Sequence, residues 1–179
     1  MMSVEEILTS NIPGVSKGTA SFLCENAVVC LSRQKHHSGV EMKCHGINDQ
    51  PEVIEWVTLY TDQMNRSHND QEVATEYGAV CISILYALHH TDYTIVQRSR
   101  KKTGFDYWLG NKNDILFQNA ARLEVSGIFD GEKMVQARVQ QKLKQVGKSD
   151  NTGLQAYISV VEFSQPSISF VKKKSYENS

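Results

Sequence analysis

A chain of 179 residues with a formal net charge of −1 has no overall basic field, so any nucleic-acid binding has to come from a local patch of charge. The hydrophobic content of 40% is enough for a substantial core at this length. No apolar run approaches the roughly 20 residues that span a bilayer, and the first residues lack the basic and apolar regions of a secretory signal. We therefore expect a soluble, cytoplasmic protein that makes no contact with a membrane.

The first third of the chain predicts a short helix, a β-hairpin and a second helix. Pro51 is expected to open the second helix, because proline is tolerated in the first turn. The two strands of the hairpin are rich in apolar and β-branched residues and are separated by a polar turn. In chain order, the four expected elements cover residues 3–9, 19–32, 39–46 and 51–66.

The middle of the chain predicts one long amphipathic helix from Asp70 to His89. Its apolar residues recur at spacings of three and four, which is the pattern of one helical face. Asn69 or Asp70 is expected to cap its first turn.

The remainder of the chain predicts three strands, a helix and a last strand, followed by a basic and frayed tail. These elements are expected at residues 93–98, 104–110, 120–128, 132–146 and 155–163. The succession of helices and strands indicates a mixed α/β domain.

Two acidic residues on neighbouring predicted strands suggest a metal site. Strand alternation places Phe105, Tyr107 and Leu109 on one face of their strand and Asp106 on the other face. In the next strand it places Glu124 on the polar face with Arg122 and Ser126. If the strands pair, Asp106 and Glu124 converge, and neighbouring carboxylates repel unless a hard cation such as Mg²⁺ or Mn²⁺ lies between them. The alternative for Asp106 is a solvent-facing carboxylate or a salt bridge to Arg122.

This pattern of an Asp strand, a Glu strand and a following helix resembles the PD-(D/E)XK nuclease superfamily over residues 70–163. The resemblance implies an α/β fold with a restriction-endonuclease-like mixed sheet flanked by helices. One domain would cover 1–179, and residues 1–69 would add an N-terminal helix and β-hairpin. Glu76 is similar to a helical glutamate that joins the metal site in several branches, and Gln145 to a helical glutamine of an exonuclease branch.

The sequence departs from the family at Ser126, where the resemblance would place a lysine. A serine hydroxyl forms hydrogen bonds but supplies no positive charge. Lys142 or Lys102 is a candidate to replace that lysine. Lys142 shares one helical face with Arg138 and Gln145 through spacings of four and three.

A basic turn leads into the Asp106 segment and is expected to hold phosphates beside the metal. A solvated hairpin turn explains the same residues equally well. The candidate nucleic-acid-binding residues, with one from the following helix, are Arg98, Arg100, Lys101, Lys102 and Arg138.

The resemblance implies a metal-dependent nuclease that hydrolyses DNA phosphodiester bonds, in bacterial defence or DNA processing. Its catalytic residues would be Asp106, Glu124, Lys142 and Gln145, and its metal ligands Asp106, Glu124 and Glu76. One alternative is a non-catalytic nucleic-acid- or protein-binding module that keeps the nuclease fold. Another is an unrelated α/β interaction protein, such as an immunity or accessory factor. A homodimer and a partner protein in a defence system both stay open.

Overall fold

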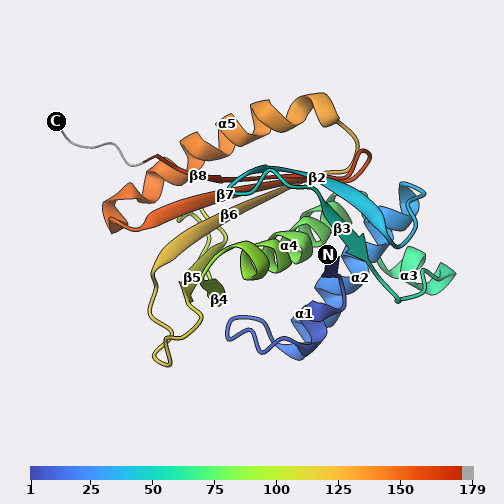
Figure 1. The fold of residues 1–179 in the computed structure, drawn as a ribbon, viewed down its shortest axis with the longest axis horizontal. Helices are drawn as coiled ribbons and strands as arrows, with labels where there is room; N and C mark the ends of the chain where they lie inside the picture. The colour runs from blue at the N-terminus through green and yellow to red at the C-terminus, as the bar shows by residue number, and fades with distance from the viewer. Residues whose placement is uncertain (175–179) are drawn as a thin grey trace.

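Eight strands form one curled mixed sheet in the computed structural model, which describes residues 1–174 (Figure 1). Their order across the sheet is β1-β3-β2-β8-β7-β6-β5-β4. The pairs β1–β3, β2–β8 and β6–β7 are parallel, and the others are antiparallel. The strands are β1 (Met2–Ser3), β2 (Val40–Gly46), β3 (Glu52–Glu55), β4 (Tyr93–Arg98), β5 (Tyr107–Asn111), β6 (Ala121–Ile128), β7 (Gln155–Glu162) and β8 (Ser167–Lys172).

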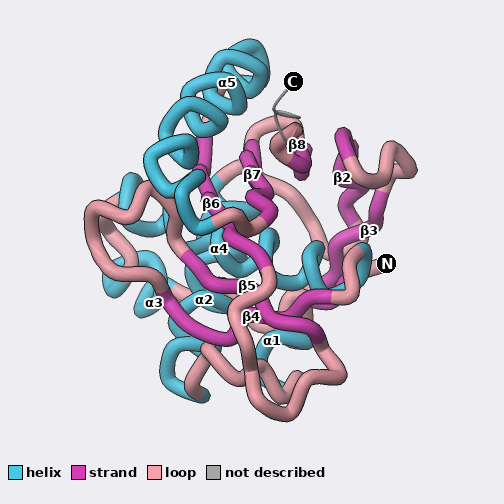
Figure 2. Tube along the Cα trace, turned by 90° about the vertical axis from the view of Figure 1, so that its left-hand side faces the viewer, coloured by secondary structure: helices cyan, strands magenta, loops and turns pink. Residues whose placement is uncertain are grey.

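Helices cover both faces of the sheet, as Figures 1 and 2 show. Helices α2 and α4 pack against each other, and α4 lies on β6 and β7 from one side. Helix α5 crosses the opposite side of β6 and β7, in the connection between these two parallel strands. The helices are α1 (Glu6–Thr9), α2 (Lys17–Arg33), α3 (Asp62–Ser67), α4 (Gln71–His90) and α5 (Val135–Val146).

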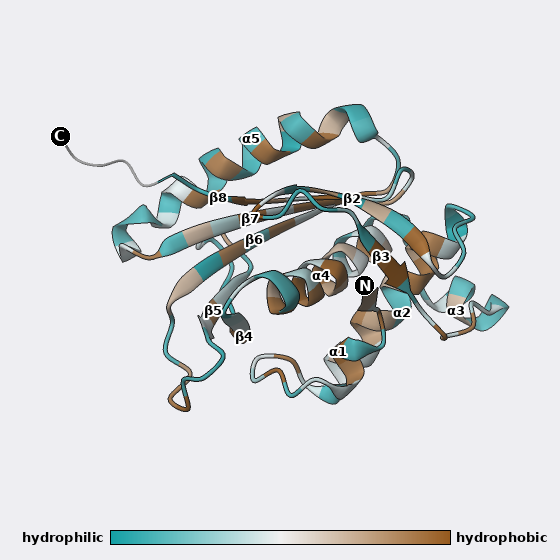
Figure 3. Cartoon of the chain, viewed as in Figure 1, coloured by the Kyte–Doolittle hydropathy of each residue, from teal (hydrophilic) through white to brown (hydrophobic). Residues whose placement is uncertain are grey.

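The sheet separates two hydrophobic cores of unequal size. The larger core lies on the side of α2 and α4 and includes Leu123 and Val125 of β6. The smaller core lies under α5 and includes Ile128 of β6 and Val139 of α5. The apolar colouring in Figure 3 runs along the inner sides of α4 and α5. Because β6 contributes to both cores, it is covered on both faces.

The predicted N-terminal hairpin is wrong, because residues 19–32 belong to helix α2 and form no strand. The Ser16 hydroxyl accepts a hydrogen bond from the backbone N–H of Thr19 and caps this helix. Residues 26–31 are buried without interruption. Burial on several sides removes the polar stripe that identifies an amphipathic helix, and a short apolar run then resembles a buried strand. The predicted strand at 39–46 is confirmed as β2, which pairs with β3 and β8.

The prediction of a helix over 51–66 is also wrong for most of its length. Glu52–Glu55 form β3, and only Asp62–Ser67 are helical, beginning at an N-cap hydrogen bond of Thr61. The helix predicted at 3–9 is confined to Glu6–Thr9.

The elements that surround the acidic residues agree with prediction more closely. Asp70 caps α4 by accepting a hydrogen bond from the N–H of Val73, and β4 matches its predicted range. The strand predicted at 104–110 starts later, at Tyr107. The end of the chain adds the unpredicted strand β8, and the predicted frayed tail falls partly on residues 175–179, which lie outside the described residues. None of the described helices has both the length and the apolar character needed to cross a membrane.

Gly127 allows α4 to lie very close to β6. A Cβ atom at this position would lie 2.3 Å from the backbone oxygen of Thr75. We expect Gly127→Ala to lower the free energy of unfolding by about 1–3 kcal/mol, because the helix or the strand must move. Gly18→Ala is the matched control, since a Cβ there meets nothing within 4 Å. Thermal unfolding should give a lower midpoint for G127A and an unchanged or higher one for G18A, and equal midpoints would contradict the prediction.

Candidate functional site

Asp106 lies at the point where β5 separates from β6. The two strands pair only from Tyr107 with Leu123 to Leu109 with Ala121. The backbone N–H of Asp106 donates to the oxygen of Leu123, and its Oδ2 accepts a hydrogen bond of 2.8 Å from the N–H of Val125. Asp106 is therefore fixed beside the unpaired half of β6 by its backbone and its side chain.

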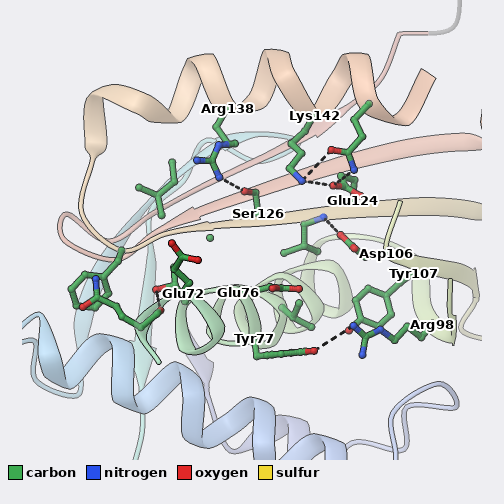
Figure 4. Close-up of a pocket in the computed structure, with 18 residues that line it drawn as sticks. Glu72, Glu76, Tyr77, Arg98, Asp106, Tyr107, Glu124, Ser126, Arg138 and Lys142 are labelled. Atoms are coloured by element: carbon green, nitrogen blue, oxygen red, sulfur yellow. Dashed lines mark hydrogen bonds and ion pairs between the residues drawn. The ribbon is translucent and has the colours of Figure 1, made fainter. Parts of the chain in front are cut away.

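A cleft of about 530 Å³ opens between α4, β6 and α5 at this fork (Figure 4). This volume lies in the usual range for a small-molecule site. We call it the carboxylate cleft, since four acidic side chains line it together with three basic ones. These are Glu72, Glu76, Asp106 and Glu124, and Arg98, Arg138 and Lys142.

The face of β6 that points toward α5 carries a row of polar side chains. Arg122, Glu124 and Ser126 alternate along this face, as the sequence predicts, and all three are buried. Lys142 and Gln145 of α5 contact Glu124. The prediction that these two residues share a helical face is therefore confirmed by their common partner.

Glu124 is the most buried acidic residue of the cleft, with 1% of its surface exposed. Its Oε1 accepts hydrogen bonds from Lys142 Nζ at 2.5 Å and from Gln145 Nε2 at 2.8 Å. Lys142 also donates to Gln145 Oε1 at 3.3 Å. The other oxygen, Oε2, has no hydrogen-bond partner among the described residues. A buried carboxylate oxygen without a partner is costly, so this atom is free to bind a cation or a proton.

Burial and the neighbouring Asp106 carboxylate together raise the pKa of Glu124 to about 7, against the opposing effect of Lys142. Both causes disfavour a second negative charge in the cleft. A divalent cation between the two carboxylates would remove the repulsion, because it neutralises both.

This pKa shift predicts a pH dependence of stability in the metal-free protein. The folded pKa lies above the ordinary value of 4.5, so the folded chain binds this proton more tightly than the unfolded chain does. Stability should therefore fall as pH rises from roughly 4.5 to about 7. Glu124→Gln stays neutral and should flatten this part of the profile, measured by thermal unfolding in a chelator. An identical slope in E124Q would show that another group produces it.

Arg122 is a structural residue and does not pair with Asp106, so the salt bridge considered between them is wrong. Its guanidinium is 3% exposed and donates to the backbone oxygens of Val146 and Leu154. It also donates to Ser149 Oγ at 2.7 Å and to Asp150 Oδ1 at 3.2 Å. Arg122 thereby fastens the connection between α5 and β7 to the sheet.

Ser126 and Arg138 meet at the position where the resemblance would place a lysine. Arg138 Nη1 donates a hydrogen bond of 2.8 Å to Ser126 Oγ. The guanidinium and the Lys142 ammonium thus bring two positive charges from α5 to the strand that carries Glu124.

The structure separates Arg98 from the other three basic residues of the turn. Arg98 lines the cleft, where it stacks on Tyr77 at 5.7 Å from the ring centre and lies 3.5 Å from the Tyr77 hydroxyl. Arg100, Lys101 and Lys102 do not line the cleft. Of the two lysines proposed to replace the missing one, Lys142 contacts Glu124, whereas Lys102 is exposed in the turn.

Sequence reasoning did not place Glu72 or Tyr77 of α4 at the site. Glu72 lies one helical turn before Glu76 and lines the cleft with it. Tyr77 falls on the apolar face expected for this helix, but it lines the cleft, and its hydroxyl group lies beside Arg98. The spacing of four between Glu72 and Glu76 was the available signal for the first.

The described residues bring two carboxylates together, and not a full set of metal ligands. No group of three or more His, Cys, Asp or Glu side chains able to hold a metal occurs within residues 1–174. Glu76 lines the cleft from α4 but is not part of such a group. Mg²⁺ commonly binds through one or two carboxylates, several waters and substrate phosphates. Asp106 and Glu124 fit this mode of binding.

No family model, no curated protein and no solved structure matches this chain. The function therefore has to be inferred from the geometry and charge of the carboxylate cleft.

Proposed function

We propose that this chain is a divalent-metal-dependent nuclease with a restriction-endonuclease-like fold, which hydrolyses DNA phosphodiester bonds. The observation that carries the proposal is the state of Glu124: a buried carboxylate beside Asp106 with one oxygen that has no partner among the described residues. Buried polar atoms are nearly always satisfied, and one without a partner at the wall of a cleft points to a missing ligand.

Asp106 and Glu124 would hold Mg²⁺ or Mn²⁺ at the fork between β5 and β6. When bound, the cation polarises a phosphodiester and makes a bound water more acidic. Gln145 orients the Glu124 carboxylate by donating to Oε1, so that Oε2 faces its ligand. Lys142 donates to the same oxygen and supplies the positive charge that Ser126 cannot.

The arrangement of elements also supports this proposal. Asp106 precedes β5, Glu124 is on the adjacent antiparallel β6, and α5 returns the chain to the parallel β7. Helix α4 supplies Glu76 from the other side of the cleft. DNA as the substrate, and a role in bacterial defence or DNA processing, rest on the resemblance to the PD-(D/E)XK superfamily.

The direct test is a cleavage assay on single- and double-stranded DNA and on RNA, with Mg²⁺ or Mn²⁺ and with a chelator as control. We expect DNA products only when a divalent cation is present. Calorimetry of Mn²⁺ binding to the same protein gives a second measurement that does not depend on choosing the right substrate. Absence of both cleavage and cation binding would overturn the proposal.

A non-catalytic module that binds nucleic acid is the second candidate. The Lys142–Glu124 ion pair favours it, since a lysine at 2.5 Å already offsets the charge of Glu124 without a metal. The two candidates differ in cation affinity. A binding module should retain DNA on its basic residues but show no Mn²⁺ binding that depends on Asp106.

A further inference from the structure

A second cavity adjoins the carboxylate cleft on the far side of the Arg98–Tyr77 pair. It has a volume of about 370 Å³ and lies beside the start of α2. Tyr77, Arg98 and Tyr107 line both cavities, so these side chains form a shared wall. We call the second cavity the aromatic annex, after Phe22, Tyr77 and Tyr107.

The annex differs from the carboxylate cleft in chemistry. Arg98 is its one charged side chain, and its remaining lining consists of glycine, threonine, leucine and aromatic residues. Phe22 of α2 is 39% exposed and lies edge-on to Tyr77, with ring centres 4.9 Å apart. An exposed aromatic ring on the wall of a cavity offers a surface for a planar, largely apolar ligand.

Arg98 supplies the charge between the two cavities. Its guanidinium stacks on Tyr77, and no carboxylate forms an ion pair with it in the described part of the chain. An arginine held by an aromatic ring and free of an acidic partner is suited to bind a phosphate. The annex thus has an aromatic platform and an anion-binding group, and the adjoining carboxylate cleft holds the two carboxylates that the proposed function assigns to hydrolysis.

We propose that the aromatic annex binds one unpaired nucleobase of the substrate, stacked on Phe22, with the adjoining phosphate on Arg98. This inference rests on the proposed function and adds a substrate class to it. A base within a duplex is stacked on both faces and cannot enter, so the site selects single strands or duplex ends with an unpaired nucleotide. Stacking on an aromatic side chain is tolerant of base identity, so the preference is for strand structure and not for sequence.

The test compares Phe22→Ala with Phe117→Ala, a matched loss of an exposed phenylalanine that lines neither cavity. Phe22→Leu keeps apolar volume in the fold but removes the ring. Fluorescence anisotropy in the presence of a chelator measures binding of a labelled DNA strand and of the blunt duplex of the same sequence. A strand of about 20 nucleotides is long enough to span the annex and the cleft. We expect F22A and F22L to bind the single strand about tenfold more weakly than wild type, with duplex binding unchanged.

Three outcomes overturn the inference, and they separate it from the proposed function. If F22A binds the single strand as tightly as F117A does while the wild type cleaves DNA, the annex assignment fails and the proposed function stands. If F22A weakens single-strand and duplex binding equally, Phe22 does not select unpaired bases. If the wild type neither binds nor cleaves nucleic acid, both proposals fail. A selective loss in F22A, with neither cleavage nor Mn²⁺ binding by the wild type, would support the annex and overturn the hydrolytic role.

Discussion

Asp106→Asn is expected to abolish metal-dependent cleavage while leaving the fold intact. The asparagine oxygen can still accept the hydrogen bond from the N–H of Val125, so the fork between β5 and β6 keeps its geometry. The variant loses one of two negative charges that hold the cation. Because metal activation is worth several kcal/mol, we expect the cleavage rate to fall at least about 1,000-fold.

The control for this variant is Asp92→Asn, which removes the charge of an exposed aspartate outside the carboxylate cleft. D92N should cleave at the wild-type rate. The free energy of unfolding of D106N should lie within about 1 kcal/mol of the wild-type value. Mn²⁺ binding by calorimetry should be lost in D106N alone. Full activity in D106N would remove Asp106 from the metal site and, with it, the central element of the proposed function.

Arg122→Leu is expected to produce the largest loss of stability of any single substitution considered. It removes the donor to the buried Ser149 hydroxyl and to the half-buried backbone oxygen of Leu154, and it leaves the Val146 oxygen with only the bond from Ser149 Oγ. Each buried acceptor that loses its donor costs about 1–3 kcal/mol, so we expect a total loss of about 3–5 kcal/mol. Arg122→Lys should recover only part of this, because an ammonium cannot reach acceptors on several sides with the planar fork of a guanidinium.

Chemical denaturation at constant pH measures this effect, with Arg100→Leu as the control at an exposed arginine. R100L should change the free energy of unfolding by no more than about 0.5 kcal/mol. A loss below about 1 kcal/mol in R122L would mean that water replaces the guanidinium, and that the network contributes little to the fold.

The parts of the fold that could be predicted are those in which local periodicity coincides with tertiary burial. Helix α4 begins at the capping Asp70 and exposes Glu72 and Glu76 in its first turns, which mark it as a helix although residues 78–87 are buried without interruption. The alternation along β6 correctly placed Glu124 on the polar face with Ser126. Helical spacing then brought Lys142 and Gln145 to one side of α5, where both contact Glu124.

The parts that could not be predicted depend on pairing between distant segments. Helix α2 is buried nearly all round at its centre, which conceals the period of 3.6 residues. Strands β1 and β3 are too short to show a period, and they pair with each other across a long stretch of the chain. Strand β8 follows β7 directly as its antiparallel neighbour, but it also pairs with the distant β2. Asp106 was predicted within a strand but precedes it, because the bond from Val125 to its side chain replaces strand pairing at that point.

The division of the molecule into two cores means that the carboxylate cleft is less durable than the protein that contains it. Lys142 and Gln145 reach Glu124 only while α5 is docked, and α5 docks through the smaller core, with Val135, Val139 and Val146. Small cooperative units open at a lower free energy than the whole chain unfolds. Excursions of α5 alone would expose Glu124 to solvent while α2 and α4 remain packed. Amide hydrogen exchange would therefore be faster in α5 than in α4, and the contacts of Lys142 and Gln145 with Glu124 would be lost at a temperature below global melting.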